Sequence, residues 1–139
     1  AHGGRVVGVI PQALVDKELA HRGLSELVVT SSMHERKAQM AARADAFVAL
    51  PGGVGTLEEI FEMWTWAQLG FHDKPCGFLD AAGYYDDLVK FLDRAVSEGF
   101  VRPGHREMLI VERSPEALLD RFASYQPPLV EKWVGRGET

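Results

Sequence analysis

The glycine-rich segment Pro51-Gly-Gly-Val-Gly-Thr-Leu-Glu-Glu59 constrains the fold of this chain most, because it directly follows the apolar run at 45–50. An apolar run, a cluster of glycines and then a helical pattern predict a strand that leads through a tight loop into a helix. We expect Gly52, Gly53 and Gly55 to permit positive φ angles and to let backbone N–H groups approach a ligand closely. Because a helix N-terminus attracts anions, the segment predicts a phosphate-binding loop.

The residues after the glycines suggest what else the ligand carries. Thr56, Glu58 and Glu59 fall in the first turns of the predicted helix. Carboxylates suit the helix dipole, but they would repel a phosphate, so we expect them to face a neighbouring, electron-poor part of the ligand. This predicts a phosphorylated sugar on which the protein acts. The alternative is a tight turn in which the glycines only reverse the chain and Thr56 or Glu58 caps the helix.

Two common nucleotide-binding motifs do not fit this segment. A dinucleotide-binding fingerprint needs a third glycine where this chain has Glu58, and a P-loop needs a lysine after its last glycine, which Gly55 lacks. The loop is therefore predicted to bind phosphate through backbone N–H groups, without the lysine of a P-loop.

Short apolar runs alternate with helical patterns along the chain, which is typical of a parallel sheet with helices on both faces. We therefore predict an α/β fold, a doubly wound, Rossmann-like parallel sheet, as a single catalytic domain over residues 1–126 with a flexible tail at 127–139. Ligands of such sheets bind at the carboxyl ends of the strands, where the glycine-rich loop lies. The expected strands are 5–10, 26–30, 45–50, 76–79 and 108–111, and the expected helices are 32–44, 56–69, 84–98 and 115–124.

Composition and charge narrow the function classes. The chain has 139 residues, 46% of them hydrophobic, and no apolar stretch near the ~20 residues of a membrane span, so we expect a cytoplasmic protein that is not a membrane protein. The net charge of −5 argues against nucleic acid as a partner. Its single cysteine, Cys76, excludes an internal disulfide and a cysteine-based zinc cluster. The start, Ala1-His-Gly-Gly-Arg5, reads like the end of a helix, so we expect an N-terminal βαβ portion to be absent.

A second group of polar residues, Ser32-Met-His-Glu-Arg-Lys37, follows another predicted strand. Arg36 can offer a planar fork to phosphate or sugar hydroxyls, and Lys37 can offer a point charge. The alternative is a solvated helix face with local pairs such as Glu35 with Gln39. His34 has no second ligand at metal-binding spacing, so no metal site is predicted.

The two segments together resemble the paired signature of the LONELY GUY-type cytokinin riboside 5′-monophosphate phosphoribohydrolases. The resemblance rests on Met33-His-Glu-Arg-Lys37 and on the segment 51–59, and it covers residues 3 to 126. Further matching segments are Gly8-Val-Ile-Pro11, Thr65-Trp-Ala-Gln-Leu-Gly70, His72-Asp-Lys-Pro75 and Gly83-Tyr-Tyr-Asp86.

The resemblance implies a homodimeric enzyme that hydrolyses the N-glycosidic bond of N6-modified adenosine 5′-monophosphates, giving free base and ribose 5-phosphate. The family's catalytic arginine and glutamate fall on Arg36 and Glu59. Its substrate-binding positions fall on Glu18, Lys37, Gly52, Gly53, Gly55, Thr56, Glu58 and Thr65. The family also begins with a strand, a helix and a second glycine-rich loop that this chain lacks. No cofactor is implied.

The chemistry of glycosidic hydrolysis suits these residues. The transition state resembles an oxocarbenium ion, so a carboxylate such as Glu59 could stabilise it or activate water. Because arginine does not give up its proton, Arg36 is expected to orient ribose or phosphate and to keep Glu59 ionised. The group that protonates the leaving base stays open between Glu58, a water molecule and the absent segment.

Two other functions remain alternatives. A general AMP nucleosidase would use the same residues without requiring the N6 substituent. A non-catalytic carrier, similar to the molybdenum-cofactor carrier proteins, would need the glycine-rich loop but not Arg36 and Glu59 together, and their joint presence favours hydrolysis. Trp64, Trp66 and Phe71 could stack on the base, although aromatic residues at helical spacing more often form a core.

Overall fold

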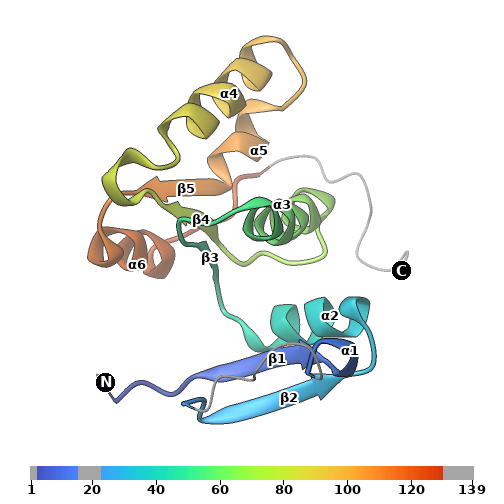
Figure 1. Ribbon diagram of the computed structural model, residues 1–139. Helices are drawn as coiled ribbons and strands as arrows, with labels where there is room; N and C mark the ends of the chain where they lie inside the picture. Colours follow the sequence, from blue (N-terminus) through green and yellow to red (C-terminus); the bar gives the residue numbers. More distant parts are fainter. Residues whose placement is uncertain (1–2, 16–22, 130–139) are drawn as a thin grey trace. The chain divides into compact units, whose positions relative to one another are not determined.

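The computed structural model describes residues 3–15 and 23–129, in which strands and helices alternate and every strand pairing is parallel (Figure 1). This confirms the predicted Rossmann-like α/β organisation. The chain separates into two compact units, residues 1–44 and residues 45–139. No helix in the described ranges is long and apolar enough to cross a membrane.

The first unit is a two-stranded sheet with helices packed on it. The strands pair in parallel, with Val7 opposite Glu26 and Pro11 opposite Thr30. Its elements are β1 (Val7–Pro11), α1 (Gln12–Val15), β2 (Glu26–Thr30) and α2 (Met33–Arg43). The longer helix begins because the Ser32 side chain accepts a hydrogen bond from the N–H of Glu35, so this predicted helix start is confirmed.

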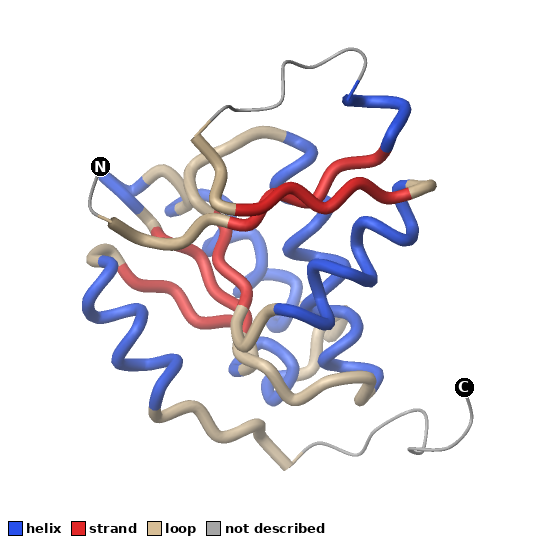
Figure 2. The backbone as a smooth tube through the Cα atoms, turned by 90° about the horizontal axis from the view of Figure 1, so that it is seen from below, coloured by secondary structure: helices blue, strands red, loops and turns tan. Residues whose placement is uncertain are grey.

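The second unit is a three-stranded sheet in the order β3-β4-β5, whose strands are red in Figure 2. Its strands are β3 (Phe47–Ala49), β4 (Cys76–Leu79) and β5 (Leu109–Glu112). Its helices are α3 (Val54–Leu69), η1 (Ala81–Gly83), α4 (Asp86–Ser97), α5 (Pro103–Glu107) and α6 (Pro115–Ala123).

Helices cover both faces of this sheet, as two neighbouring residues of β4 demonstrate. The ring of Phe78 lies 6.3 Å from that of Phe61 on α3. A methyl group added to Gly77 would lie 3.0 Å from Leu118 and from Phe122 on α6. Since successive residues of a strand point to opposite faces, α3 and α6 pack on opposite faces, as a doubly wound sheet requires.

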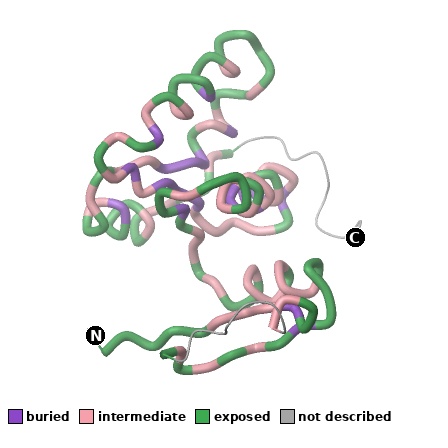
Figure 3. The backbone as a smooth tube through the Cα atoms, viewed as in Figure 1, coloured by how far each residue is buried: buried purple, intermediate pink, exposed green. Residues whose placement is uncertain are grey.

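The core of the second unit lies where these helices meet the sheet, and its buried residues are purple in Figure 3. Phe78 is fully buried, and its ring contacts that of Tyr85 at 4.5 Å. Trp64 is also buried, and its indole N–H donates to the carbonyl of His105 at 2.8 Å. The interpretation of Trp64 as a core residue is therefore confirmed.

Several element boundaries differ from the sequence-based expectation. β2 and β4 have the predicted bounds, and the helix stops at Gly70 and Gly99 are confirmed by left-handed φ angles of 84° and 83°. α3 begins at Val54, two residues before the predicted start. The two short helices α1 and α5 were not predicted, because four or five residues are too few to display helical periodicity. The single domain over residues 1–126 stays a prediction.

Candidate functional site

The glycine-rich loop leaves β3 and enters α3 in an extended conformation. Gly53 is the residue preceding the helix, with φ −96° and ψ −156°, and its carbonyl accepts the N–H of Leu57 at 3.1 Å. Among the described glycines, positive φ angles occur only at positions 3, 70, 83 and 99. The expectation that Gly52, Gly53 and Gly55 adopt positive φ is therefore wrong, since the chain enters the helix directly from extended backbone.

Of these three glycines, only Gly52 is required for space. A methyl group on Gly52 would collide with the hydroxyl of Thr56, which lies over the loop. A methyl group on Gly53 or Gly55 would meet nothing within 4 Å, so the backbone of both residues borders open space. The helix start is left without a side-chain cap, and its first N–H groups have no acceptor within the helix. The result is an accessible, donor-rich helix N-terminus, as a bound phosphate requires.

The two carboxylates follow one turn after the glycines. Glu58 is exposed and Glu59 is half-buried. Both lie near Gly55 on the helix surface, at spacings of three and four residues, so their side chains flank the open helix start. This arrangement puts the carboxylates beside the N–H donors of the helix start without placing them among these donors.

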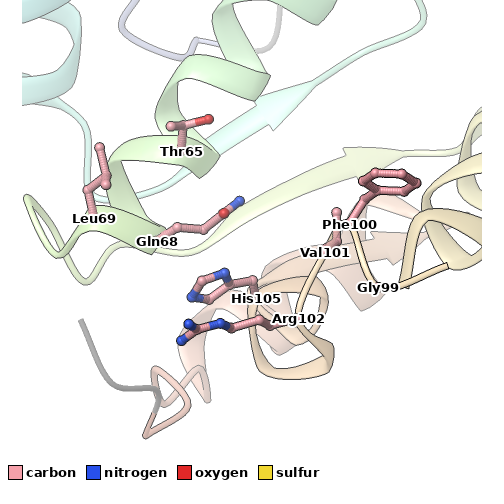
Figure 4. A pocket seen from close by; sticks show the side chains of 8 residues that line it. All are labelled: Thr65, Gln68, Leu69, Gly99, Phe100, Val101, Arg102 and His105. Carbon is pink, nitrogen blue, oxygen red and sulfur yellow. The ribbon is translucent and has the colours of Figure 1, made fainter. Parts of the chain in front are cut away.

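Thr65 lies farther along α3, and its hydroxyl donates to the carbonyl of Phe61 at 2.7 Å. It lines a cavity of about 360 Å³ together with Gln68 and His105 (Figure 4). Two helical turns separate Thr65 from Glu58, so the structure places it away from the glycine-rich loop. Its role in binding substrate stays a prediction.

Arg36 and Lys37 are half-buried residues of α2, in the first unit. The Nε atom of Arg36 donates to the carbonyl of Val9 at 3.0 Å, which fixes the guanidinium plane against β1. Arg36 is thus already oriented by backbone of its own unit. A fixed guanidinium is better suited to recognising an anion than a freely rotating one, because less side-chain entropy is lost on binding.

Glu35 supports the start of the same helix. Its carboxylate accepts hydrogen bonds from the N–H and the hydroxyl of Ser31, at 2.7 Å and 2.6 Å. The Ser31 hydroxyl is the larger cause, and both bonds lower the pKa of Glu35 from its ordinary value. Glu35 therefore bonds to the loop that precedes the helix. Within the described part of the chain its carboxylate makes no hydrogen bond to Gln39, the local pair that the alternative interpretation expected.

Neither a nucleophilic cysteine nor a metal cluster is found in the described ranges. Cys76 is buried in β4, and burial raises the pKa of its thiol to about 12, so it stays protonated and unreactive. No group of three or more histidine, cysteine or acidic side chains gathers within those ranges.

The structure thus brings together part of the predicted site. Gly52, Gly53, Gly55, Thr56, Glu58 and Glu59 form one continuous segment at the carboxyl end of β3. Arg36 and Lys37 belong to the first unit, so the pairing of Arg36 with Glu59 stays a prediction. Glu18 lies outside the described residues.

Sequence reasoning gave no role to two tyrosines that contact the loop. The hydroxyl of Tyr84 donates to the carbonyl of Gly52, and that of Tyr85 donates to the carbonyl of Leu50. The one available signal was the segment Gly83-Tyr-Tyr-Asp86, which belongs to the family resemblance but carries no recognisable chemistry of its own.

A parallel α/β fold with an open, glycine-rich helix start at the end of a strand is typical of proteins that bind phosphorylated ligands. A family profile described as "Possible lysine decarboxylase" matches residues 1–122. The chain belongs to this family.

Curated relatives agree with the predicted resemblance. A rice (Oryza sativa subsp. japonica) protein named probable cytokinin riboside 5′-monophosphate phosphoribohydrolase LOGL2 is 49% identical over 127 residues, which are 91% of this chain and 52% of the relative. Two Arabidopsis thaliana proteins named cytokinin riboside 5′-monophosphate phosphoribohydrolase, LOG5 and LOG3, are 46% and 48% identical over 90% of this chain, and 55% and 59% of their own lengths are covered. The resemblance to the LONELY GUY-type family is confirmed, and the chain spans little more than half of these relatives.

Proposed function

We propose that this protein is a nucleoside 5′-monophosphate phosphoribohydrolase that acts on N6-modified AMP and releases the free base and ribose 5-phosphate. The observation that carries the proposal is the uncapped helix start at Gly53 with Glu59 in the second turn of α3. Relatives that are 46–49% identical bear the name of this activity. A phosphate site beside a carboxylate is what hydrolysis of a 5′-phosphorylated glycoside needs.

In the proposed reaction, water adds to the anomeric carbon of the ribose while the bond to the base nitrogen breaks. Glu59 stabilises the positive charge that develops on the sugar or removes a proton from the attacking water. The N–H groups around Gly53 and Gly55 hold the 5′-phosphate. Arg36 keeps its proton, and orients the ribose phosphate as a charged, bidentate donor. The departing base takes up one proton, for which Glu58 and solvent water are the candidate donors.

The phosphate requirement provides the test. We would measure release of free base from N6-isopentenyl-AMP, from AMP and from the N6-isopentenyl nucleoside that lacks the phosphate. The proposal predicts release from the modified monophosphate, slower release from AMP, and none above background from the nucleoside. Equal rates for AMP and its modified form would favour a general AMP nucleosidase. Binding of the monophosphate without release of any base would favour a carrier.

The same proposal includes a homodimeric assembly and a location in the cytoplasm. The partner is a small-molecule nucleotide and not nucleic acid. Sedimentation velocity of the intact protein tests the assembly. A single boundary at twice the monomer mass is the expected result, and a monomer that remains fully active would remove the dimer from the proposal.

A further inference from the structure

Two adjacent tyrosines hold the glycine-rich loop from a distant part of the sequence. The hydroxyl of Tyr84 donates to the carbonyl oxygen of Gly52 at 2.8 Å. The hydroxyl of Tyr85 donates to the carbonyl oxygen of Leu50 at 2.6 Å. The two bonds therefore hold the chain on both sides of Pro51, before it enters α3.

The turn that presents these tyrosines is itself firmly built. Asp80 is buried, and its Oδ1 atom accepts the N–H of Tyr85 at 2.6 Å. Ala82 and Gly83 adopt positive φ angles of 54° and 72°, a conformation that costs energy at an alanine and persists where the surroundings enforce it. A methyl group on Gly83 would lie 2.7 Å from a carboxylate oxygen of Asp86.

The rings of the two tyrosines are also fixed, and they differ in burial. They pack edge to face, with centroids 4.9 Å apart. Tyr85 is 2% exposed and belongs to the core, whereas Tyr84 is 57% exposed. Burial is the main cause that raises the pKa of Tyr85, so its hydroxyl remains a donor at neutral pH. Removing the hydroxyl of Tyr84 should consequently disturb the loop without disturbing the core.

The bond from Tyr84 acts on one particular peptide group. A trans peptide is planar, so the direction of the Gly52 carbonyl also sets the direction of the N–H of Gly53. Gly53 borders open space immediately before α3, where the proposed phosphate site lies. Because Tyr84 holds this carbonyl, the Gly52–Gly53 peptide group cannot flip, and the N–H of Gly53 points away from the tyrosine.

We propose that Tyr84 is a positioning residue for phosphate binding, which orients the Gly52–Gly53 peptide so that the N–H of Gly53 is available to the anion. This inference rests on the proposed function for the identity of the ligand. Tyr84 does not touch the reacting atoms. It preorganises a donor, and loss of such a bond weakens binding because the peptide must then be ordered when the ligand arrives.

The test is the substitution Tyr84→Phe in the intact protein, with ribose 5-phosphate as the calorimetric probe. Loss of one neutral hydrogen bond predicts affinity for ribose 5-phosphate about five-fold weaker. We expect KM for the nucleotide monophosphate to rise by a similar factor, with kcat within about two-fold and the melting temperature unchanged. Affinity for free adenine, which carries no phosphate, should stay the same.

Tyr125→Phe is the matched control. Tyr125 is half-buried after α6, and its hydroxyl makes no hydrogen bond within residues 3–15 and 23–129. The Tyr125→Phe protein should bind ribose 5-phosphate with the affinity of the unsubstituted protein. Unchanged affinity in Tyr84→Phe, or an equal loss in both variants, would overturn the inference.

A second variant, at the buried Tyr85, separates an effect on the position of the loop from an effect on the stability of the fold. Tyr85→Phe leaves the carbonyl of Leu50 without its donor, so we expect a lower melting temperature together with weaker binding. If Tyr84→Phe instead lowers the melting temperature as much as Tyr85→Phe does, and weakens the binding of adenine as much as that of ribose 5-phosphate, the role of Tyr84 is structural and the proposal fails. Absence of hydrolysis in the unsubstituted protein would contradict the proposed function alone, because the ribose 5-phosphate measurement does not require turnover.

Discussion

The two units of the chain bury apolar side chains to very different extents. In the described ranges, Pro11 is the one buried apolar residue of the first unit, and all other buried hydrophobic side chains belong to the second unit, from Ala49 to Leu118. In the first unit, Leu27 and Val29 remain 40% and 45% exposed, on the same face of β2. The second unit therefore has a core of its own, whereas the two strands of the first unit lack one among the described residues. The glycine-rich loop lies in the unit with the core.

Separating the units should give the largest effect. We expect residues 45–139 alone to unfold cooperatively in denaturant, because this unit buries both faces of its sheet. Residues 1–44 alone should remain unfolded, since a two-stranded sheet with one short and one longer helix cannot offset the entropy of ordering. Circular dichroism during urea titration measures both. A cooperative transition in the shorter fragment would break the comparison.

Truncating one apolar side chain in each unit sharpens the same comparison. Phe78→Ala should lower the free energy of unfolding by about 3–5 kcal/mol, because it removes a fully buried ring from β4. Leu27→Ala should cost less than about 1 kcal/mol, because the side chain is already substantially exposed. Chemical denaturation of both variants at one pH gives the values. Similar losses would mean that Leu27 is buried in the protein in solution.

Two glycine substitutions within the second unit separate packing from binding. Gly77→Ala should cost about 1–3 kcal/mol, since its methyl group would lie 2.9 Å from the carbonyl of Ile110. Gly55→Ala should instead raise stability by about 0.5–1 kcal/mol, because it adds a methyl group in open space within a helix.

The same Gly55→Ala protein should bind ribose 5-phosphate more weakly, because its methyl group occupies the surface where we place the phosphate. Calorimetry with Gly77→Ala serves as the control for nonspecific effects. Unimpaired binding by a stabilised Gly55→Ala protein would mean that the anion does not lie against this residue.

Acid should destabilise the second unit at a higher pH than the first. Burial lowers the pKa of His72 and of His105, so the folded protein holds these protons less tightly than the unfolded chain. Stability is complete above the ordinary histidine pKa of about 6.5, and it falls as the pH drops below that value. In the first unit, Glu26 and Glu35 have lowered pKa values. Their contributions to the stability of the folded protein are lost only below about pH 4.5.

Unfolding free energies between pH 7.5 and pH 5 test this effect. Each histidine can contribute a slope of at most about 1.4 kcal/mol per pH unit. The substitution His105→Gln should flatten the curve. A curve for His105→Gln that matches the unsubstituted protein would remove His105 as a cause.

Sequence patterns predicted those parts of the structure that depend on local chemistry. β2 and β4 have their predicted bounds because apolar runs bounded by polar or turn residues define them. α2 begins at Met33 because the hydroxyl of Ser32, the residue before it, caps the helix. The glycine-rich loop and the carboxylate after it were likewise identified from neighbouring residues.

Features that depend on tertiary contacts were not predictable in this way. The bond between Tyr84 and Gly52 joins residues 32 positions apart, and the anchoring of Arg36 to Val9 spans 27. The conformation of the loop was mispredicted because glycine permits positive φ without requiring it. Here the crowding of Gly52 by Thr56 is what excludes a larger side chain.

The assignment of Glu59 as the residue that carries the reaction is the central claim, and one measurement tests it most directly. We would compare free-base release from N6-isopentenyl-AMP by the unsubstituted protein and by Glu59→Gln, after confirming equal melting temperatures and equal affinity for ribose 5-phosphate. The account predicts rapid release by the first and a rate lower by about 10²–10⁴ in the second. Full activity in Glu59→Gln, or no release by the unsubstituted protein, would contradict it.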